Sequence, residues 1–180
     1  YVRRDVAFGE HPRKTRRALY RLNDPFLRFF FRFVLPHESA LAQGVTAEAA
    51  RSWHEQCSQH FASCWEGLCR PAVPRVPQGD ARWGPACAWW SGAGKQAEID
   101  VVAESADKKA ILLGECKWSE RGQAFDLDAM DRKLRLQASR MPWTRGRRVV
   151  TSCWLGGAAE GKGRIDWLPT AEDVMTALRY

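Results

Sequence analysis

Residues 98–118 read EIDVVAESADKKAILLGECKW, and this stretch decides the fold. Two apolar runs on either side of a polar turn predict a β-hairpin. The first run carries Asp100, and the second closes on Glu115, Cys116 and Lys117. Because strand side chains alternate between two faces, Glu115 and Lys117 should point to the same side of the sheet. Asp100, on the preceding strand, is expected to join them.

Two carboxylates beside one ammonium group are typical of Mg²⁺-dependent cleavage of phosphodiesters. The alternative is a chance arrangement, because glutamate and lysine often decorate the ends of strands. The lysine favours the first interpretation. The chain has 7 lysines against 21 arginines, yet one of the few lysines stands in this position.

The segments around the hairpin predict an α/β domain built on a mixed sheet. Helical periodicity extends from Ala47 to Cys69, and the helix should end before Pro71. After it we expect a strand, the hairpin, a helix, two strands and a last helix opened by Thr170 or Pro169. Their ranges are 81–91, 98–118, 122–142, 147–157, 163–169 and 171–180.

The positive charge of the chain is concentrated at its start. Of the net charge of +7, +6 lies in residues 1–35, which hold nine Lys/Arg and three Asp/Glu. Residues 1–22 predict two strands around a basic turn that could follow a phosphate backbone. A solvated basic hairpin is the alternative. The basic residues of the turn are Arg13, Lys14, Arg16 and Arg17.

Residues 23–50 predict an aromatic helix followed by a polar connector. Asp24 is a favourable N-cap, Pro25 suits the first helical position, and Pro36 should end the helix. We expect its phenylalanines to form core rather than a surface for stacking bases, since dense aromatics at helical spacing usually face a core.

Neither a membrane span nor a secretory signal is expected, because no run of eighteen apolar residues occurs and the first residues are polar. Six cysteines are scattered singly without a Cys-x-x-Cys pair, which predicts reduced thiols in a cytoplasmic protein. Zinc is not expected, because four candidate ligands on one helix cannot converge on one ion. These ligands are His54, Cys57, His60 and Cys64.

The arrangement resembles the PD-(D/E)xK nuclease superfamily, with Asp100 as the first acid and Glu115 and Lys117 as the (D/E)xK pair. Ile99 stands where a proline often precedes the first acid. A more specific resemblance, to the C-terminal region of archaeal-type ATPases of the signal-transduction class, covers nearly the whole chain. The segments that carry it are YRLNDPFLRFFFRFVLP (20–36), Cys64-Trp65-Glu66, AWW (88–90), EIDVVA (98–103) and ILLGECKW (111–118).

This resemblance implies a restriction-endonuclease-like fold with an αβββαβ core, preceded by a basic hairpin and an aromatic helix. Residues 1–22 would be the end, or wing, of a winged-helix domain, residues 23–50 the aromatic helix and connector, and residues 51–180 the nuclease-like domain. The ATPase module would be a partner, because no Walker motif occurs in this chain.

The resemblance and the chemistry together assign roles at the site. Asp100, Glu115 and the backbone carbonyl of Cys116 would hold Mg²⁺ or Mn²⁺. Lys117 would orient or help deprotonate the attacking water and stabilise charge on the phosphoryl oxygens. Further candidates are Glu66, which matches the family's helix acid, Glu98, which shares a face with Asp100, and the helix residue Gln137.

The site residues and the resemblance together therefore imply Mg²⁺-dependent hydrolysis of DNA phosphodiesters by the C-terminal domain of an ATPase. One alternative is an inactive nuclease-fold module that binds DNA or regulates its ATPase. Another is a plain interaction domain that uses Trp89, Trp90 and Trp118, although these are expected to be core or walls of the site.

Overall fold

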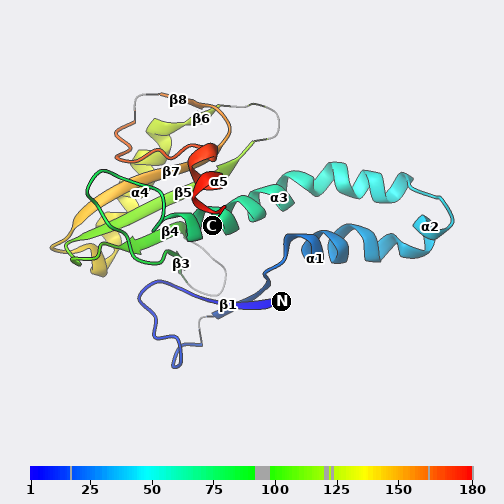
Figure 1. Cartoon of the computed structure of the whole chain (residues 1–180), viewed down its shortest axis with the longest axis horizontal. Coiled ribbons are helices and arrows are strands. Elements are labelled where there is room, and N and C mark those ends of the chain that lie inside the picture. Colours follow the sequence, from blue (N-terminus) through cyan, green and yellow to red (C-terminus); the bar gives the residue numbers. More distant parts are fainter. Residues whose placement is uncertain (17, 92–97, 120–121, 123, 162, 180) are drawn as a thin grey trace.

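The computed structural model describes residues 1–16, 18–91, 98–119, 122, 124–161 and 163–179. Its centre is a four-stranded sheet in which three strands run antiparallel and the fourth runs parallel to its neighbour (Figure 1). The predicted mixed α/β architecture is confirmed. In order across the sheet, the strands are β3 (Cys87–Trp90), β4 (Glu98–Glu104), β5 (Ala110–Trp118) and β7 (Arg148–Gly156).

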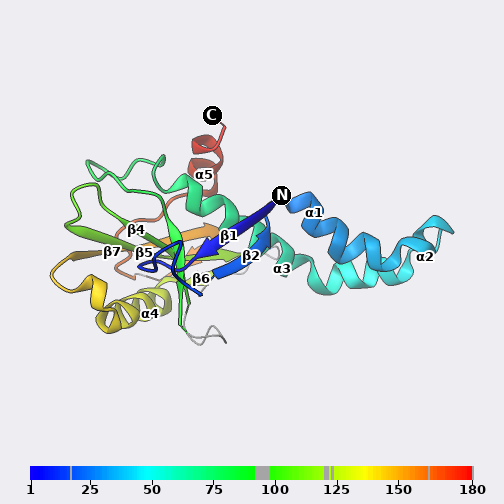
Figure 2. The same ribbon diagram turned by 90° about the horizontal axis from the view of Figure 1, so that it is seen from below.

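The sheet separates two apolar layers. The long helix α3 (Ala47–Ala72) covers one face together with α5 (Ala171–Ala177), and α4 (Leu127–Arg140) covers the other (Figure 2). Strand β5 lies in the middle, and its residues 110–116 are buried. Trp90 is buried, and Trp89 and Trp118 pack against the core clusters, as expected of core residues.

Helix α3 differs from its predicted end. It continues through Pro71 to Ala72, so that the proline lies in the last turn. Proline removes one hydrogen bond there, but Cys69, Ala72 and Val73 are at most 1% exposed and hold the turn against the sheet. Burial of these apolar groups therefore outweighs the local preference of proline.

Helices α1 (Pro25–Phe29) and α2 (Glu38–Ala42) and the first half of α3 form an arm that extends away from the sheet (Figures 1 and 2). Asp24 caps α1 as predicted, but Pro36 does not end the helical path. A π-helical turn, Phe30–Val34, and a 3-10 turn, Leu35–His37, connect the two helices. Pro36 is tolerated because it lies at the start of the 3-10 turn.

The arm has an aromatic core of its own. Phe33 is 3% exposed, and its ring centroid lies 5.1 Å from that of Trp53 and 5.6 Å from that of Phe29. Phe26 and Phe31, in contrast, are 66% and 50% exposed. The expectation that the phenylalanines form core is therefore confirmed for one side of the helix alone.

The N-terminal hairpin forms as predicted, from β1 (Val2–Val6) and β2 (Ala18–Leu22). Its far end joins the edge of the main sheet, where the backbone N–H of Phe8 donates to the carbonyl of Ala88 at 2.9 Å. An apolar cluster that includes Ala7 and Trp90 seals this junction. The body of the protein thus supports a hairpin that would be marginal in isolation.

The segment after β7 also differs from prediction, because residues 163–169 form an isolated bridge rather than a strand. Trp167 bridges Ser152, and the carboxylate of Asp166 accepts hydrogen bonds from the backbone and hydroxyl of Thr151. The Asp166 side chain thus bonds to the edge of β7, where the backbone of a full strand would otherwise pair. Short strands β6 (Phe125–Asp126) and β8 (Ala159–Glu160) pair instead, and Thr170 caps α5 with a capping box.

No helix among the described residues is long and apolar enough to cross a membrane, as the sequence predicted. All six cysteines are free thiols, in agreement with the absence of Cys-x-x-Cys pairs.

Candidate functional site

The pairing of β4 with β3 is irregular near Asp100, where the register shift indicates a β-bulge. Cys87 lies opposite Val102, and two residues further along β3, Trp89 lies opposite Ile99. The two-residue step from Cys87 to Trp89 on β3 thus faces a three-residue step from Val102 to Ile99 on β4. The additional residue of β4 lies in this interval, which contains Asp100. Bulges redirect side chains and are over-represented next to active sites.

Asp100 and Glu115 are neighbours across two strands. The β4–β5 ladder ends with Val101 opposite Gly114, and the next positions on the two strands are Asp100 and Glu115. The carboxylate of Asp100 accepts a hydrogen bond from the backbone N–H of Cys116 through Oδ2, at 2.8 Å. This bond holds the Asp100 side chain against β5 beside the second acid.

Glu115 is paired with two ammonium groups. Its side chain is 3% exposed, and Lys117 Nζ lies 2.8 Å from Oε1. Lys133 on α4 lies 2.7 Å from both Oε1 and Oε2. The sequence therefore correctly placed Glu115 and Lys117 on one side of the sheet, but Lys133 was missed.

A signal for Lys133 was present in the sequence. The inward face of α4 follows the helical spacing of Met130, Leu134 and Ala138, which are buried. Counted from Met130, Lys133 and Gln137 fall at the i+3 and i+7 positions, which belong to the same stripe. Polar residues that interrupt a buried stripe need partners, and both have one in the sheet.

The electrostatics of the two acids are asymmetric. Burial and the charge of Glu115 raise the pKa of Asp100 from 3.8 to about 7, against the opposing hydrogen bond from Cys116. Burial alone would lower the pKa of Lys117, but the hydrogen bond and charge of Glu115 and the charge of Asp100 outweigh it and raise the pKa. Lys117 is therefore an ammonium at neutral pH.

Glu66 borders the site from α3. Its charge contributes to the raised pKa of Asp100, and its carboxylate lies 3.7 Å from Arg70 and 4.0 Å from Arg21. Arg70 is 8% exposed and donates to the backbone carbonyl of Asp100 at 2.9 Å. Glu66 thus faces arginines on one side and the Asp100 position on the other.

Glu98 was expected to share a face with Asp100 because strand side chains alternate. The bulge follows Glu98 and interrupts this alternation. Its backbone carbonyl accepts a hydrogen bond from Gln137 Nε2 at 3.0 Å. Gln137 Oε1 is buried without a hydrogen-bond partner among the described residues. Gln137 therefore fastens α4 to the strand that carries Asp100.

The basic turn is not part of this cluster. Arg13, Lys14 and Arg16 are exposed in the connection between β1 and β2, and Arg17 lies outside the described residues. Their hairpin adjoins edge strand β3, whereas Glu115 lies two strands away on β5. The turn and the acids are thus separate features of the surface.

The donor set at Asp100 and Glu115 suits a hard divalent cation that keeps several waters. Mg²⁺ is often held by one or two carboxylates together with substrate phosphates. The N–H and C=O of a strand residue point the same way, so the Cys116 carbonyl faces Asp100 as its N–H does. Within the described residues, no group of three or more His, Cys, Asp or Glu is placed to hold a metal ion, so Asp100 and Glu115 would act as a pair.

Comparison with known proteins identifies one family model that matches this chain. The family model DUF234, described as archaea bacterial proteins of unknown function, matches residues 30–131. The chain belongs to the DUF234 family. No curated protein and no solved structure matches it. The DUF234 match runs from the arm into α4 and includes Glu66, Asp100, Glu115 and Lys117, whereas Lys133 lies just beyond it.

Proposed function

We propose that this DUF234 chain is a divalent-metal-dependent phosphodiesterase that acts on DNA. The single observation that carries the proposal is the position of Asp100 beside Glu115 on adjacent strands, with the Lys117 ammonium on Glu115. The mixed sheet, with α3 before it and α4 as the crossover, is compatible with a restriction-endonuclease-like domain. An ATPase module would be the partner that directs it.

The two acids have a binding role in this proposal. Asp100, Glu115 and the carbonyl of Cys116 would hold Mg²⁺ or Mn²⁺. When bound, the ion would supply Lewis-acid polarisation of a phosphoryl oxygen and a water of lowered pKa. Asp100 is suited to this role because a cation would offset the burial and the repulsion by Glu115 that now raise its pKa.

Lys117 acts as a cation rather than a base. Its raised pKa keeps the proton on Nζ at neutral pH, so it cannot accept one from water. The side chain is 43% exposed, which leaves the ammonium accessible to a substrate. Lys117 would therefore stabilise the charge that develops on the phosphoryl oxygens.

The test is cleavage of supercoiled plasmid and linear DNA in Mg²⁺ or Mn²⁺, with EDTA as the blank. We expect the wild-type protein to cut, and Asp100→Asn and Lys117→Met to lose roughly 100-fold or more, since each removes a charge needed in the transition state. Glu172→Gln and Lys109→Met remove the same charges from exposed positions and should cut normally. Equal cutting by Asp100→Asn and the wild-type protein would overturn the proposal.

A second candidate function is a nucleic-acid-binding module without catalysis. It is favoured by the two ammonium groups that already neutralise Glu115. In this case calorimetry should detect no heat of Mn²⁺ binding, while salt-dependent binding of DNA persists.

A further inference from the structure

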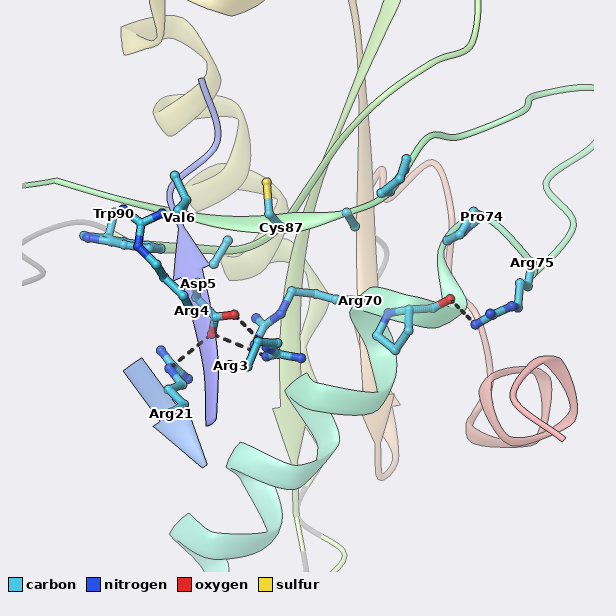
Figure 3. Close-up of a pocket in the computed structure, with 14 residues that line it drawn as sticks. Arg3, Arg4, Asp5, Val6, Arg21, Arg70, Pro74, Arg75, Cys87 and Trp90 are labelled. Carbon is cyan, nitrogen blue, oxygen red and sulfur yellow. Dashed lines mark hydrogen bonds and ion pairs between the residues drawn. The ribbon is translucent and has the colours of Figure 1, made fainter. Parts of the chain in front are cut away.

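A strongly basic cavity lies beside the acids rather than at them. It has a volume of about 570 Å³ and lies between the N-terminal hairpin, the end of α3 and the segment that enters β3 (Figure 3). A second cavity of about 350 Å³ continues from it along α3. Both are lined by Arg3, Arg21 and Arg70.

The charge of the larger cavity is strongly one-sided. Five arginines line it against a single acid, Asp5, which leaves 5 − 1 = +4. Another cavity of similar size, about 530 Å³, has three basic and two acidic residues, or 3 − 2 = +1. The excess of charge is therefore a property of this place and not of cavities in this chain generally. The five arginines are Arg3, Arg4, Arg21, Arg70 and Arg75.

The three arginines that line both cavities have two carboxylates, Asp5 and Glu66, as partners. Asp5 accepts from Arg3 through both oxygens, at 2.7 and 3.3 Å, and Arg21 Nε lies 3.5 Å from its Oδ2. Glu66 lies 3.7 Å from Arg70 and 4.0 Å from Arg21. Both contacts of Arg21, at 3.5 and 4.0 Å, are longer than a normal N–H···O hydrogen bond of about 2.7–3.2 Å. Since each guanidinium carries five N–H groups, most donors of Arg21 have no close acceptor in the described structure.

The cavity connects to the acid site through Arg70. Its guanidinium lines the cavity and also donates to the backbone carbonyl of Asp100 at 2.9 Å. Because Arg70 is 8% exposed, its charge acts in a region that water screens poorly. A ligand on these arginines would therefore lie next to Asp100.

We propose that the arginine-lined cavity binds the phosphodiester backbone of a nucleic-acid strand and leads it to Asp100 and Glu115. Planar guanidinium groups match the oxygens of a phosphate in pairs and keep their charge at every accessible pH. The ligand class rests on the proposed function, but the binding does not require cleavage. The basic side chains at 13–16 do not line the cavity, although the turn lies near it, because Arg4 donates to the backbone carbonyls of Pro12 and Thr15.

The experiment measures binding of a fluorescent DNA oligonucleotide by anisotropy in EDTA, where no metal-dependent cleavage occurs. Arg3→Gln/Arg21→Gln should weaken binding about tenfold near 0.1 M salt and lower the slope of log K against log salt by about 2. Asp5→Asn should have the opposite effect, because it frees donors of both arginines. We expect it to tighten binding several-fold.

Two controls make the outcome specific. Arg82→Gln/Arg148→Gln removes the same charge from the +1 cavity and should change affinity less than twofold. Arg3→Lys/Arg21→Lys keeps the charge, so its binding should recover most of the loss if the glutamine variant is folded.

Equal weakening by both glutamine pairs, or unchanged binding by Arg3→Gln/Arg21→Gln, would refute the assignment. Tight binding of an acidic peptide at the same arginines, without binding of DNA, would refute it as well. Intact DNA binding without cleavage in Mg²⁺ would refute the proposed phosphodiesterase but leave the cavity assignment standing. The two failures are thus distinguishable.

Discussion

Lys133 Nζ lies 2.7 Å from both carboxylate oxygens of Glu115, so α4 pairs this acid with a cation of its own. A divalent ion at Glu115 therefore has to displace an ammonium group. The first prediction concerns this competition. Lys133→Met should bind Mn²⁺ about tenfold more tightly than the wild-type protein, or about 1.4 kcal/mol, by isothermal titration calorimetry.

Arg132→Met is the matched control for Lys133→Met, because it removes an exposed cation from the preceding position of the same helix. Its Mn²⁺ affinity should equal that of the wild-type protein. A Lys133→Met variant that binds Mn²⁺ more weakly than both would show that Lys133 supports the ion rather than competing with it.

The second prediction concerns pH. The pKa of Asp100 is raised from 3.8 to about 7, so its folded state binds a proton that the unfolded state has lost. The resulting stability is fully present below pH 3.8 and is lost as the pH rises through about 7. Three pKa units correspond to at most about 4 kcal/mol.

Urea unfolding in EDTA at pH 4 to 8 checks this sign. The difference in unfolding free energy between the wild-type protein and Asp100→Asn should fall steadily with rising pH, because asparagine does not titrate. A difference that is flat, or that grows with pH, would show that Asp100 is ionised in the folded protein throughout this range.

The third prediction concerns Gly114, the residue before Glu115 on β5. A Cβ atom there would lie 2.6 Å from Ser152 Oγ and 2.9 Å from Val101 Cβ. Gly114→Ala should therefore destabilise the protein by about 1–3 kcal/mol through overpacking. Thermal unfolding measures this.

Gly67→Ala provides the contrasting case, since its Cβ would meet nothing closer than 4.0 Å and lies in α3. That change should be neutral or stabilising by up to ~1 kcal/mol, because alanine favours a helix over glycine. Similar losses in the two alanine variants would contradict the packing argument.

The fourth prediction concerns the arm. Phe33→Ala removes a ring that is 3% exposed and packs on Trp53 and Phe29, so the local cost should be about 3–5 kcal/mol. Because the arm has its own core, we expect it to open before the sheet does. Limited proteolysis should then cut within residues 24–60 first.

Phe31→Ala tests the same residue type at a position that is 50% exposed. Its arm should resist the protease as the wild-type arm does. Loss of the whole sheet in Phe33→Ala, measured by the unfolding of the tryptophan-rich core, would show that arm and sheet unfold as one unit.

Much of the fold could be predicted from local pattern. The apolar runs of β4 and β5, the stripe of α4 and the caps Asp24 and Thr170 have local causes that act wherever the chain places them. Pro36 and Pro71 were misjudged, because the packing of distant apolar residues decided how far those helices continue.

By itself the sequence determined that Glu115 and Lys117 share a side of a strand and that Asp100 stands on its neighbour, because alternation and hairpin pairing are local rules. The tertiary structure alone decided that Lys133 pairs with Glu115, and that Arg70 joins the hairpin arginines beside Asp100. These contacts join segments far apart in the chain, so their geometry depends on how α3, α4 and the hairpin pack on the sheet.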